Sequence, residues 1–455
     1  VHALGSYIYI FSLNTLAQAV FSSYIDSTAK QASEMQGQYI ALVAEGEDDS
    51  SKRWPRKRAL TVAGVLTTIV AVHVVVSAWT RSDVAGAGPT ELDAGAVPVF
   101  RIVASSFFDA GFQHGQVARG RIRGWFASAE MQSVVAFTNG EGLEAFERLK
   151  ADNTAEFPEY VEEMRGIAEG AGVSLDAVWC ANMLNELENL MSIRRNKANG
   201  SKHCSDVYAI SSGGYSAGFA HGHNDDWSDA VKPFWYIMAV TYKSSDAERQ
   251  LGFQRCAGVA YPAALVGWAP TWNDHGIFST QNSLVPRRSR PGGLACSFVQ
   301  RRAVCGSRNL DEVTRMLSVP GWSDSASMNI VDVRHKRMAN MEIWEDRHSV
   351  FEVTEDRHNY THFNEFKHLR TASNKRIDDA RLFTHDPRQA RADALPAPRS
   401  DEDVMTILSD PQIFRPTATI TTVVLNGSTG VLKLWCGVPS ASNAPAYTWD
   451  MLDFF

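Results

Sequence analysis

Two stretches decide how this chain folds: Cys204-Ser205-Asp206-Val207-Tyr208 and His223-Asn224-Asp225-Asp226-Trp227. A polar run that ends at His203 places a cysteine at the start of a predicted strand, and Ser212-Gly213-Gly214 predicts a turn that reverses the chain. A second apolar run, residues 217–220, leads into the polar cluster. The two strands of this hairpin would bring a thiol close to a dense group of polar side chains. We interpret the pair as an acyl-transfer site whose nucleophile becomes a chain terminus.

A thiol at this position needs a base, because the nucleophile is the thiolate and a free cysteine titrates near about 8.5. If the His203–Cys204 bond were cut, Cys204 would carry its own base, an α-amine with a pKa of roughly 7.7–8.0. The thiol can make this cut by attacking the preceding carbonyl, after which water resolves the ester. The alternative is the usual one for a cysteine, a small buried hydrophobic side chain.

The order of the predicted elements indicates the fold class. Helical periodicity extends from residue 111 to about 191, and strand-like runs dominate after Cys204. Two helices, 294–306 and 309–318, interrupt the strands, and residues 386–400 have loop composition. This order differs from βαβ alternation and favours an α+β fold of stacked antiparallel sheets covered by helices. The predicted strands are 206–211, 217–222, 234–242, 276–282, 328–333, 338–344, 418–424 and 431–436.

Composition excludes several classes of protein. The 455 residues carry a net charge of -7, which argues against a nucleic-acid-binding surface. The 6 cysteines contain no C-x-x-C pair, so a zinc knuckle is not expected. All of them lie at or after Cys180 and could sit in one domain, but their spacing defines no disulfide framework.

Residues 59–79 are the strongest local signal in the N-terminal part. They contain no Asp, Glu, Lys or Arg, and at about 1.5 Å per residue they span roughly the 30 Å of a bilayer core. Basic residues crowd the preceding side, and only Arg81 follows closely. The positive-inside rule then predicts a single-pass anchor with residues 1–58 in the cytoplasm and the rest lumenal or extracellular. A buried core helix is the alternative.

The remaining boundaries follow from composition. Residues 80–96 are small and flexible and are predicted to be a linker. The folded domain is expected over residues 97–455, beginning with the strand-like run Val97-Pro98-Val99-Phe100.

Several short motifs resemble one family in order and spacing. The chain is similar to the acyl-coenzyme A:6-aminopenicillanic acid acyltransferase family of N-terminal-nucleophile (Ntn) hydrolases, over about residues 100–455. Within the family, the likeness is strongest to amidohydrolases that release β-alanine from amines. The motifs are Cys204-Ser205-Asp206-Val207, Gly222-His223-Asn224-Asp225-Asp226, Gly276-Ile277, Asn282-Ser283-Leu284-Val285-Pro286, Arg301-Arg302-Ala303-Val304, Asn329-Ile330-Val331-Asp332 with Glu342, His362-Phe363-Asn364-Glu365, Ser373-Asn374-Lys375-Arg376 and Gly437-Val438-Pro439.

This resemblance implies a four-layer αββα fold and an amidohydrolase or acyltransferase that cuts itself between residues 203 and 204. It would form an acyl thioester from a small amide, such as a β-alanyl amine. The two fragments would stay associated, and no cofactor or metal is implied. Cys204 matches the nucleophile, Asn282 the oxyanion donor, and Asp226 and Asn224 the residues that order the new terminus. Ser205, His223 and Arg376 match supporting positions.

Three positions depart from the family's pattern. His203 stands before the cysteine where the family has a small residue, and Ser205 stands where many members have threonine. His362-Phe363-Asn364-Glu365 replaces a His-Thr-Asn-His motif. The first departure bears on the rate of cleavage and the last on the identity of the substrate.

Two other classes of function remain open. His221, His223, Asp225 and Asp226 superficially resemble the ligand motif of a zinc-dependent hydrolase, since two histidines and a carboxylate are credible zinc ligands. The fourth histidine of that motif is replaced by Asp226, and no downstream histidine completes the set. A membrane-anchored, catalytically inactive binding domain would keep the fold without the chemistry. The aromatic residues near the cluster are core residues by default, although one or two could face an amine.

Overall fold

The computed structural model describes residues 91–92, 97–194, 204–243, 255–284, 290–357, 359–369, 387–440 and 442–455, all within the compact unit that spans residues 89–455. The predicted segment 1–58, the predicted anchor 59–79 and His203 lie outside the described residues. In the described part of the chain, no helix is both long enough and apolar enough to cross a membrane.

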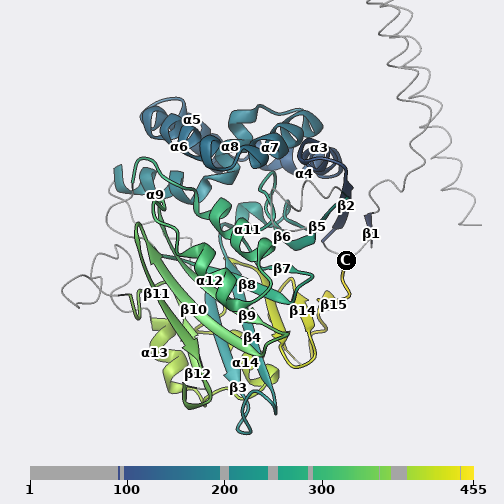
Figure 1. The fold of residues 1–455 in the computed structure, drawn as a ribbon, viewed down its shortest axis with the longest axis vertical. Coiled ribbons are helices and arrows are strands. Elements are labelled where there is room, and N and C mark those ends of the chain that lie inside the picture. Colours follow the sequence, from purple (N-terminus) through teal and green to yellow (C-terminus); the bar gives the residue numbers. More distant parts are fainter. Residues whose placement is uncertain are drawn as a thin grey trace, which may run out of the picture. The chain divides into compact units, whose positions relative to one another are not determined.

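Helices occupy most of residues 107–194, as predicted, and gather at one end of the domain (Figure 1). One of them begins at Pro158, which suits a first helical turn, and ends before Gly172, whose φ of 67° is left-handed. The helices are α3 (Phe107–Val117), α4 (Arg119–Phe126), α5 (Ala129–Thr138), α6 (Leu143–Glu156), α7 (Pro158–Ala171), α8 (Leu175–Asn182) and α9 (Leu184–Arg194).

Glycines let α3 and α7 approach backbone to backbone. A Cβ added at Gly111 would lie 1.8 Å from the carbonyl oxygen of Glu163, and one at Gly170 would lie 2.2 Å from that of Phe112. Only glycine tolerates such contacts, so these positions determine how closely the two helices pack.

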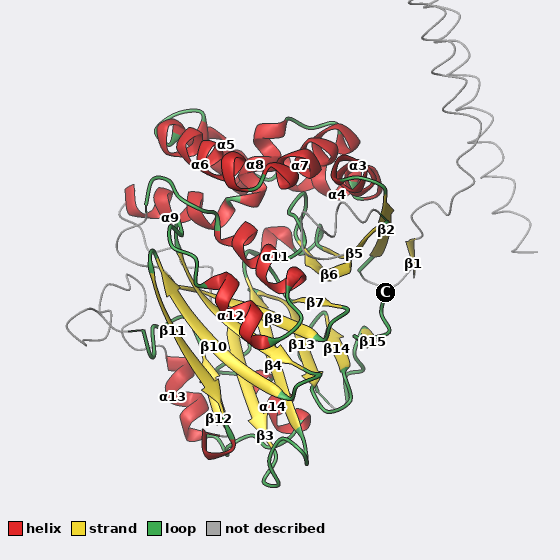
Figure 2. Ribbon diagram, viewed as in Figure 1, coloured by secondary structure: helices red, strands yellow, loops and turns green. Residues whose placement is uncertain are grey.

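Two β-sheets contain all the named strands, and all of these strands except β1 and β2 follow Cys204 (Figure 2). The larger sheet has 9 strands, in which β2 and β5 pair in parallel. Its order is β1 (Glu91–Leu92), β2 (Val99–Ala104), β5 (Tyr236–Tyr242), β6 (Arg255–Ala260), β7 (Thr271–Asn273), β8 (Ile277–Leu284), β9 (Ser325–Asp332), β10 (Arg337–Trp344) and β11 (Arg347–Val353). The smaller sheet has 6 strands, all antiparallel, in the order β12 (Asn359–His362), β3 (Ser205–Ile210), β4 (Phe219–Asp226), β13 (Thr419–Asn426), β14 (Val431–Trp435) and β15 (Tyr447–Asp450).

Helices cover both sheets. α11 (Cys296–Gly306) and α12 (Leu310–Leu317) pack on the larger sheet, and α14 (Asp401–Leu408) packs on β3, β4 and β13 of the smaller one. The expectation of stacked sheets covered by helices is therefore confirmed, and the sheets are antiparallel as predicted except where β2 pairs with β5. The loop expected over 386–400 is partly wrong, because α13 (Pro387–Ala394) forms there, with Pro387 as its first residue.

The interface between the two sheets is polar as well as apolar. From β3, the Tyr208 hydroxyl donates to Asn329 Oδ1 on β9 at 2.9 Å. Asn329 in turn accepts from Asn340 Nδ2 on β10 at 2.7 Å, and all three residues are buried. Because a buried polar group without a partner is costly, these bonds specify how the sheets align.

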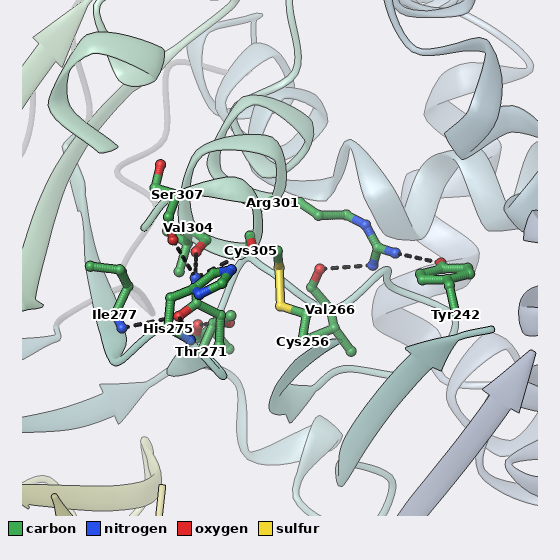
Figure 3. The surroundings of a disulfide bond; sticks show 12 residues. Tyr242, Cys256, Val266, Thr271, His275, Ile277, Arg301, Val304, Cys305 and Ser307 are labelled. Atoms are coloured by element: carbon green, nitrogen blue, oxygen red, sulfur yellow. Dashed lines mark hydrogen bonds between the residues drawn. A yellow bond between two sulfur atoms is a disulfide. The ribbon is translucent and has the colours of Figure 1, made fainter. Parts of the chain in front are cut away.

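A disulfide joins β6 to α11, through Cys256 and Cys305, whose Cα atoms are 5.4 Å apart (Figure 3). Near it, Arg301 of α11 donates to the Val266 carbonyl at 2.9 Å and to the Tyr242 hydroxyl at 3.1 Å. The cysteine spacing did not predict which cysteines pair. In the structure, Cys256 and Cys305 form a disulfide. The other four cysteines are free: Cys180, Cys204, Cys296 and Cys436.

Candidate functional site

Strand alternation decides which residues meet at Cys204. Successive side chains on a strand point to opposite faces, so Cys204 and Asp206 share the face of β3 that meets the larger sheet. On β4, His223 lies directly opposite Asp206, and His221 and Asp225 share its face. The hairpin therefore gathers a thiol, two imidazoles and two carboxylates.

Asp206 lies at the centre of this group and is fully buried. Its carboxylate bonds His221 Nε2 at 3.0 Å and His223 Nδ1 at 2.8 Å, and it accepts a bond from the Thr280 hydroxyl on β8. Burial alone would raise the pKa of Asp206, but the charge of His223 and the bonds from both imidazoles hold it below its usual range. Asp206 is therefore an anion held by histidines.

His223 connects Asp206 to the thiol. Because Nδ1 faces Asp206, Nε2 is the ring nitrogen left to interact with Cys204. Burial opposes a charge on His223, but Asp206 raises the pKa of this imidazole well above its usual value. Burial raises the pKa of the Cys204 thiol, and the nearby His223 acts against that rise. The thiol itself donates to the Asp226 carbonyl at 3.8 Å. Cys204, His223 and Asp206 thus lie in the order that a relay of nucleophile, base and orienting carboxylate would need.

Asp226 lies near Arg388, which was not predicted from the sequence as a site residue. Burial raises the pKa of Asp226 to about 7, and the charge of Arg388 opposes that rise from 3.9 Å away. Arg388, on α13, also donates to the Cys204 carbonyl and the Ser205 hydroxyl, both at 3.1 Å. The only sequence signal for it was Pro387 at the start of a short helix.

Asn282 does not line the space beside the thiol. Its amide donates to the His362 carbonyl at 3.3 Å and accepts from Asn329 at 2.8 Å, inside the interface between the sheets. Its neighbours on β8, Gln281 and Ser283, line the cavity instead, and Gln281 Oε1 is buried there with no hydrogen-bond partner in the described part of the chain.

The other predicted residues divide between the faces of the smaller sheet. Asn224 points toward α14 and donates to the Leu408 carbonyl there at 3.0 Å. It also accepts a hydrogen bond from Thr422 on β13 at 2.7 Å. Ser205 faces Arg388, as described above. Arg376 lies outside the described residues.

A small cavity opens beside the sulfur, with a polar side and an aromatic side. Cys204, His223, Asp225 and Asp226 line the polar side. The aromatic side consists of Trp227, Tyr261 and Trp268, which also pack edge to face on one another. The cavity therefore places a nucleophile, carboxylates and aromatic rings within one small volume.

The donor atoms that could hold a metal differ from the set predicted by sequence. Atoms of Cys204, His223 and Asp225 lie within 4.8 Å of one another, whereas His221 Nε2 is bonded to Asp206. Asp226 is beside Arg388 and is not in the group.

Comparison with known proteins supports the resemblance predicted from the motifs. A family model described as acyl-coenzyme A:6-aminopenicillanic acid acyl-transferase matches residues 216–437, so the likeness to that family is confirmed over this segment. The match includes β4 and β8 but begins after Cys204.

One curated relative is the β-alanyl-dopamine/carcinine hydrolase of Drosophila melanogaster, with 21% identity over 241 residues. The alignment covers 51% of this chain and 61% of the relative, so the chain spans about three fifths of that protein.

Solved structures overlap the chain only loosely. The Caenorhabditis elegans N-acylethanolamine-hydrolyzing acid amidase ortholog has a TM-score of 0.36 and 13% identity, covering 50% of this chain and 93% of its own. A conjugated bile acid hydrolase from Clostridium perfringens has a TM-score of 0.32 and 10% identity, covering 55% and 92%. Because these TM-scores are low, the arrangement of layers is argued only from the sheets and helices of this chain.

Replacing Asp206 by Asn tests the relay. The neutral amide no longer favours a charged His223, so the thiolate loses its cationic partner and the thiol pKa rises. We expect alkylation of Cys204 by iodoacetamide at neutral pH to slow about 10-fold for each unit of that rise. Peptide mass spectrometry across pH gives the rate, with exposed Cys436 as the internal control. Identical pH profiles for Cys204 in the two proteins would contradict the relay.

Proposed function

We propose that this chain is a cysteine amidohydrolase or acyltransferase with an Ntn-hydrolase fold, and that it forms an acyl thioester on Cys204. The observation that carries the proposal is the Cys204–His223–Asp206 relay beside a small cavity. The family match over residues 216–437 and the named activity of the fly relative support the same chemistry.

The relay suggests the order of proton movements. His223 takes the thiol proton, the sulfur attacks the amide carbonyl, and the carbonyl oxygen becomes an oxyanion that needs a donor. When the C–N bond breaks, the leaving amine takes the proton from His223. Water, or a second amine, then attacks the thioester and frees the sulfur. Gln281 is the amide side chain placed to reach this cavity, whereas Asn282 already donates to a backbone carbonyl.

The first amide attacked would be the chain's own His203–Cys204 bond. The sulfur bonds to the His203 carbonyl carbon, the peptide C–N bond breaks, and the nitrogen becomes the α-amine of Cys204. Water then hydrolyses the thioester, which leaves a carboxylate on His203 and a free thiol on Cys204. His223 would act as the base in this step, because the α-amine of Cys204 is still part of the peptide bond. After cleavage, the α-amine is a second base at the same sulfur.

Contacts across the proposed cut would hold the fragments together. Strand β2 from the first fragment pairs with β5 from the second. Glu163 of α7 lies 2.8 Å from Arg301 of α11, with both side chains buried. Asn182 of α8 donates to the Ala263 carbonyl at 2.9 Å. Since a buried ion pair that loses one partner leaves an unpaired charge, separation of the fragments would be costly.

Intact-mass analysis of the expressed chain, with Cys204→Ala beside it, tests cleavage. Wild type should yield two masses that co-purify, with the second fragment starting at Cys204, because the sulfur is the attacking group. The variant should remain one chain, and a matched Cys436→Ala control should be cut. A wild-type chain that stays intact yet hydrolyses amides would sink the processing step. A chain that stays intact and inactive would favour a binding domain without chemistry.

The cavity suits an acyl group that ends in an ammonium. Asp225 lies beside the thiol, and its Oδ2 is buried without a partner in the described part of the chain. Burial raises the pKa of Asp225, although His223 and the Tyr261 hydroxyl act against that rise, so a bound cation would further offset the cost of its charge. Trp227, Tyr261 and Trp268 line the same cavity, where a ring face would attract the ammonium. A β-alanyl group has such an ammonium, four bonds from the sulfur of its thioester.

A pair of substrates tests this specificity, the β-alanyl amide of an amine and the isosteric butyryl amide. A hydrogen bond to a charged group is worth about 1.5–3 kcal/mol, so we expect kcat/KM to favour β-alanyl about 10-fold or more. Asp225→Asn should narrow that preference, while Asp229→Asn, a change to an exposed carboxylate, should keep it. Equal preference in wild type and Asp225→Asn would refute the role of Asp225.

The chain's location is also a proposal. Residues 59–79 would anchor the protein, with the domain on the lumenal or extracellular side. The Cys256–Cys305 disulfide supports this side, because disulfides persist in oxidising compartments. Deleting residues 1–80 should release a soluble, active protein from membranes, as judged by fractionation and amide hydrolysis. A deleted protein that still sediments with membranes would contradict the anchor.

A further inference from the structure

Three donor atoms converge in the cavity in a way that substrate chemistry alone does not require. The Cys204 sulfur, a His223 ring nitrogen and an Asp225 oxygen all lie within 4.8 Å of one another, on buried side chains. Thiolate, imidazole and carboxylate are the three ligand types of zinc sites, and three protein ligands leave a fourth position open.

The surroundings of His223 resemble those of a metal ligand. Its Nδ1 is bonded to Asp206 at 2.8 Å, which leaves Nε2 toward the cavity. Asp206 is itself held by His221 and Thr280. Histidines that bind metals usually have such a carboxylate behind them, which sets the tautomer and the ring orientation.

A second observation, which also favours an ammonium in the substrate, points to a cation at the same place. Asp225 Oδ2 is buried and has no hydrogen-bond partner within the described ranges. A buried carboxylate oxygen of this kind lacks the partner that nearly all such atoms have. A cation bound between Asp225, His223 and Cys204 would supply it.

The donor set selects the kind of cation. Magnesium and calcium prefer oxygen ligands, whereas a thiolate with an imidazole suits zinc. If Cys204 is a chain terminus, its α-amine can join the sulfur on the metal in a five-membered chelate ring and complete four ligands.

We propose that Cys204, His223 and Asp225 form a binding site for zinc or a similar thiophilic divalent ion, which inhibits the enzyme by occupying its nucleophile. Binding forms a metal–sulfur bond and releases the thiol proton, with no change of oxidation state. The inhibition rests on the proposed function, whereas the binding does not. This site differs from a zinc-hydrolase site because the metal would block the reaction that the sulfur performs.

Titration of the purified, metal-stripped full chain with zinc, and with cobalt as a spectroscopic probe, tests the site. One equivalent should bind, and cobalt should give a sulfur-to-metal charge-transfer band that Cys204→Ala abolishes. Affinity should fall about 10-fold or more in Asp225→Asn and about 10–100-fold in Asp206→Asn, which removes the support behind His223. Cys436→Ala and Asp229→Asn, matched thiol and carboxylate controls, should bind like wild type.

A measurement on the unaltered protein covers the case in which a variant fails to fold. Zinc should protect Cys204, but not Cys436, from iodoacetamide, and a chelator should restore alkylation. Amide hydrolysis in the presence of chelator, lost on adding zinc, would support both the inhibition and the thiol mechanism. An active enzyme whose Cys204 stays equally reactive with zinc would overturn the site and leave the proposed function standing. Metal binding to a chain inactive in chelator would overturn the proposed function instead.

Discussion

The buried carboxylate of Asp206 is the constraint on which the rest of the structure depends. A charge removed from water is costly unless it is paired and hydrogen-bonded, and Asp206 is fully buried between two sheets. Its three partners come from two elements: His221 and His223 from the neighbouring strand, and Thr280 from the opposite sheet. A shift of one residue in the β3–β4 register would turn both imidazoles away from it. The same group therefore specifies the hairpin, the alignment of the sheets and the position of the thiol.

In the proposed mechanism, this arrangement gives the Cys204 sulfur a base both before and after self-cleavage. Before any cut, His223 is the base available, held toward Cys204 by Asp206. After the cut, the new amine adjoins the same sulfur. A nucleophile that first cleaves its own chain and then attacks a small amide has to be reactive both in the precursor and in the cleaved enzyme. A carboxylate–imidazole pair behind the thiol provides that competence without a change in the fold.

Much of the architecture could be predicted from residue patterns. The helix that begins at Pro158, the hairpin after Cys204 and the strands near residues 276–282 and 338–344 form where their periodicity indicates. Strands such as β6, β7, β11 and β12 were not predicted, and of these β7 and β12 are so short that their residues give no reliable period. The sequence also predicted that a thiol and a polar cluster would meet.

The details of the site were less predictable because they depend on which face of a strand each side chain takes. Asp206 was not predicted to be a site residue, although it lies two residues from Cys204 and therefore shares the same face of the strand. Asn224 was grouped with its neighbours, yet alternation turns it toward α14. Arg388 comes from a helix far along the chain, and no local pattern links it to Cys204. Such long-range contacts require the tertiary fold.

The central claim is that the Cys204 sulfur carries the acyl group. Acid quenching of the enzyme during turnover of a β-alanyl amide, followed by peptide mass spectrometry, tests it most directly. We expect a peptide that begins at Cys204 and is heavier by one acyl group, which hydroxylamine removes. Turnover without any acylated Cys204, or an acyl group found on another residue, would contradict it.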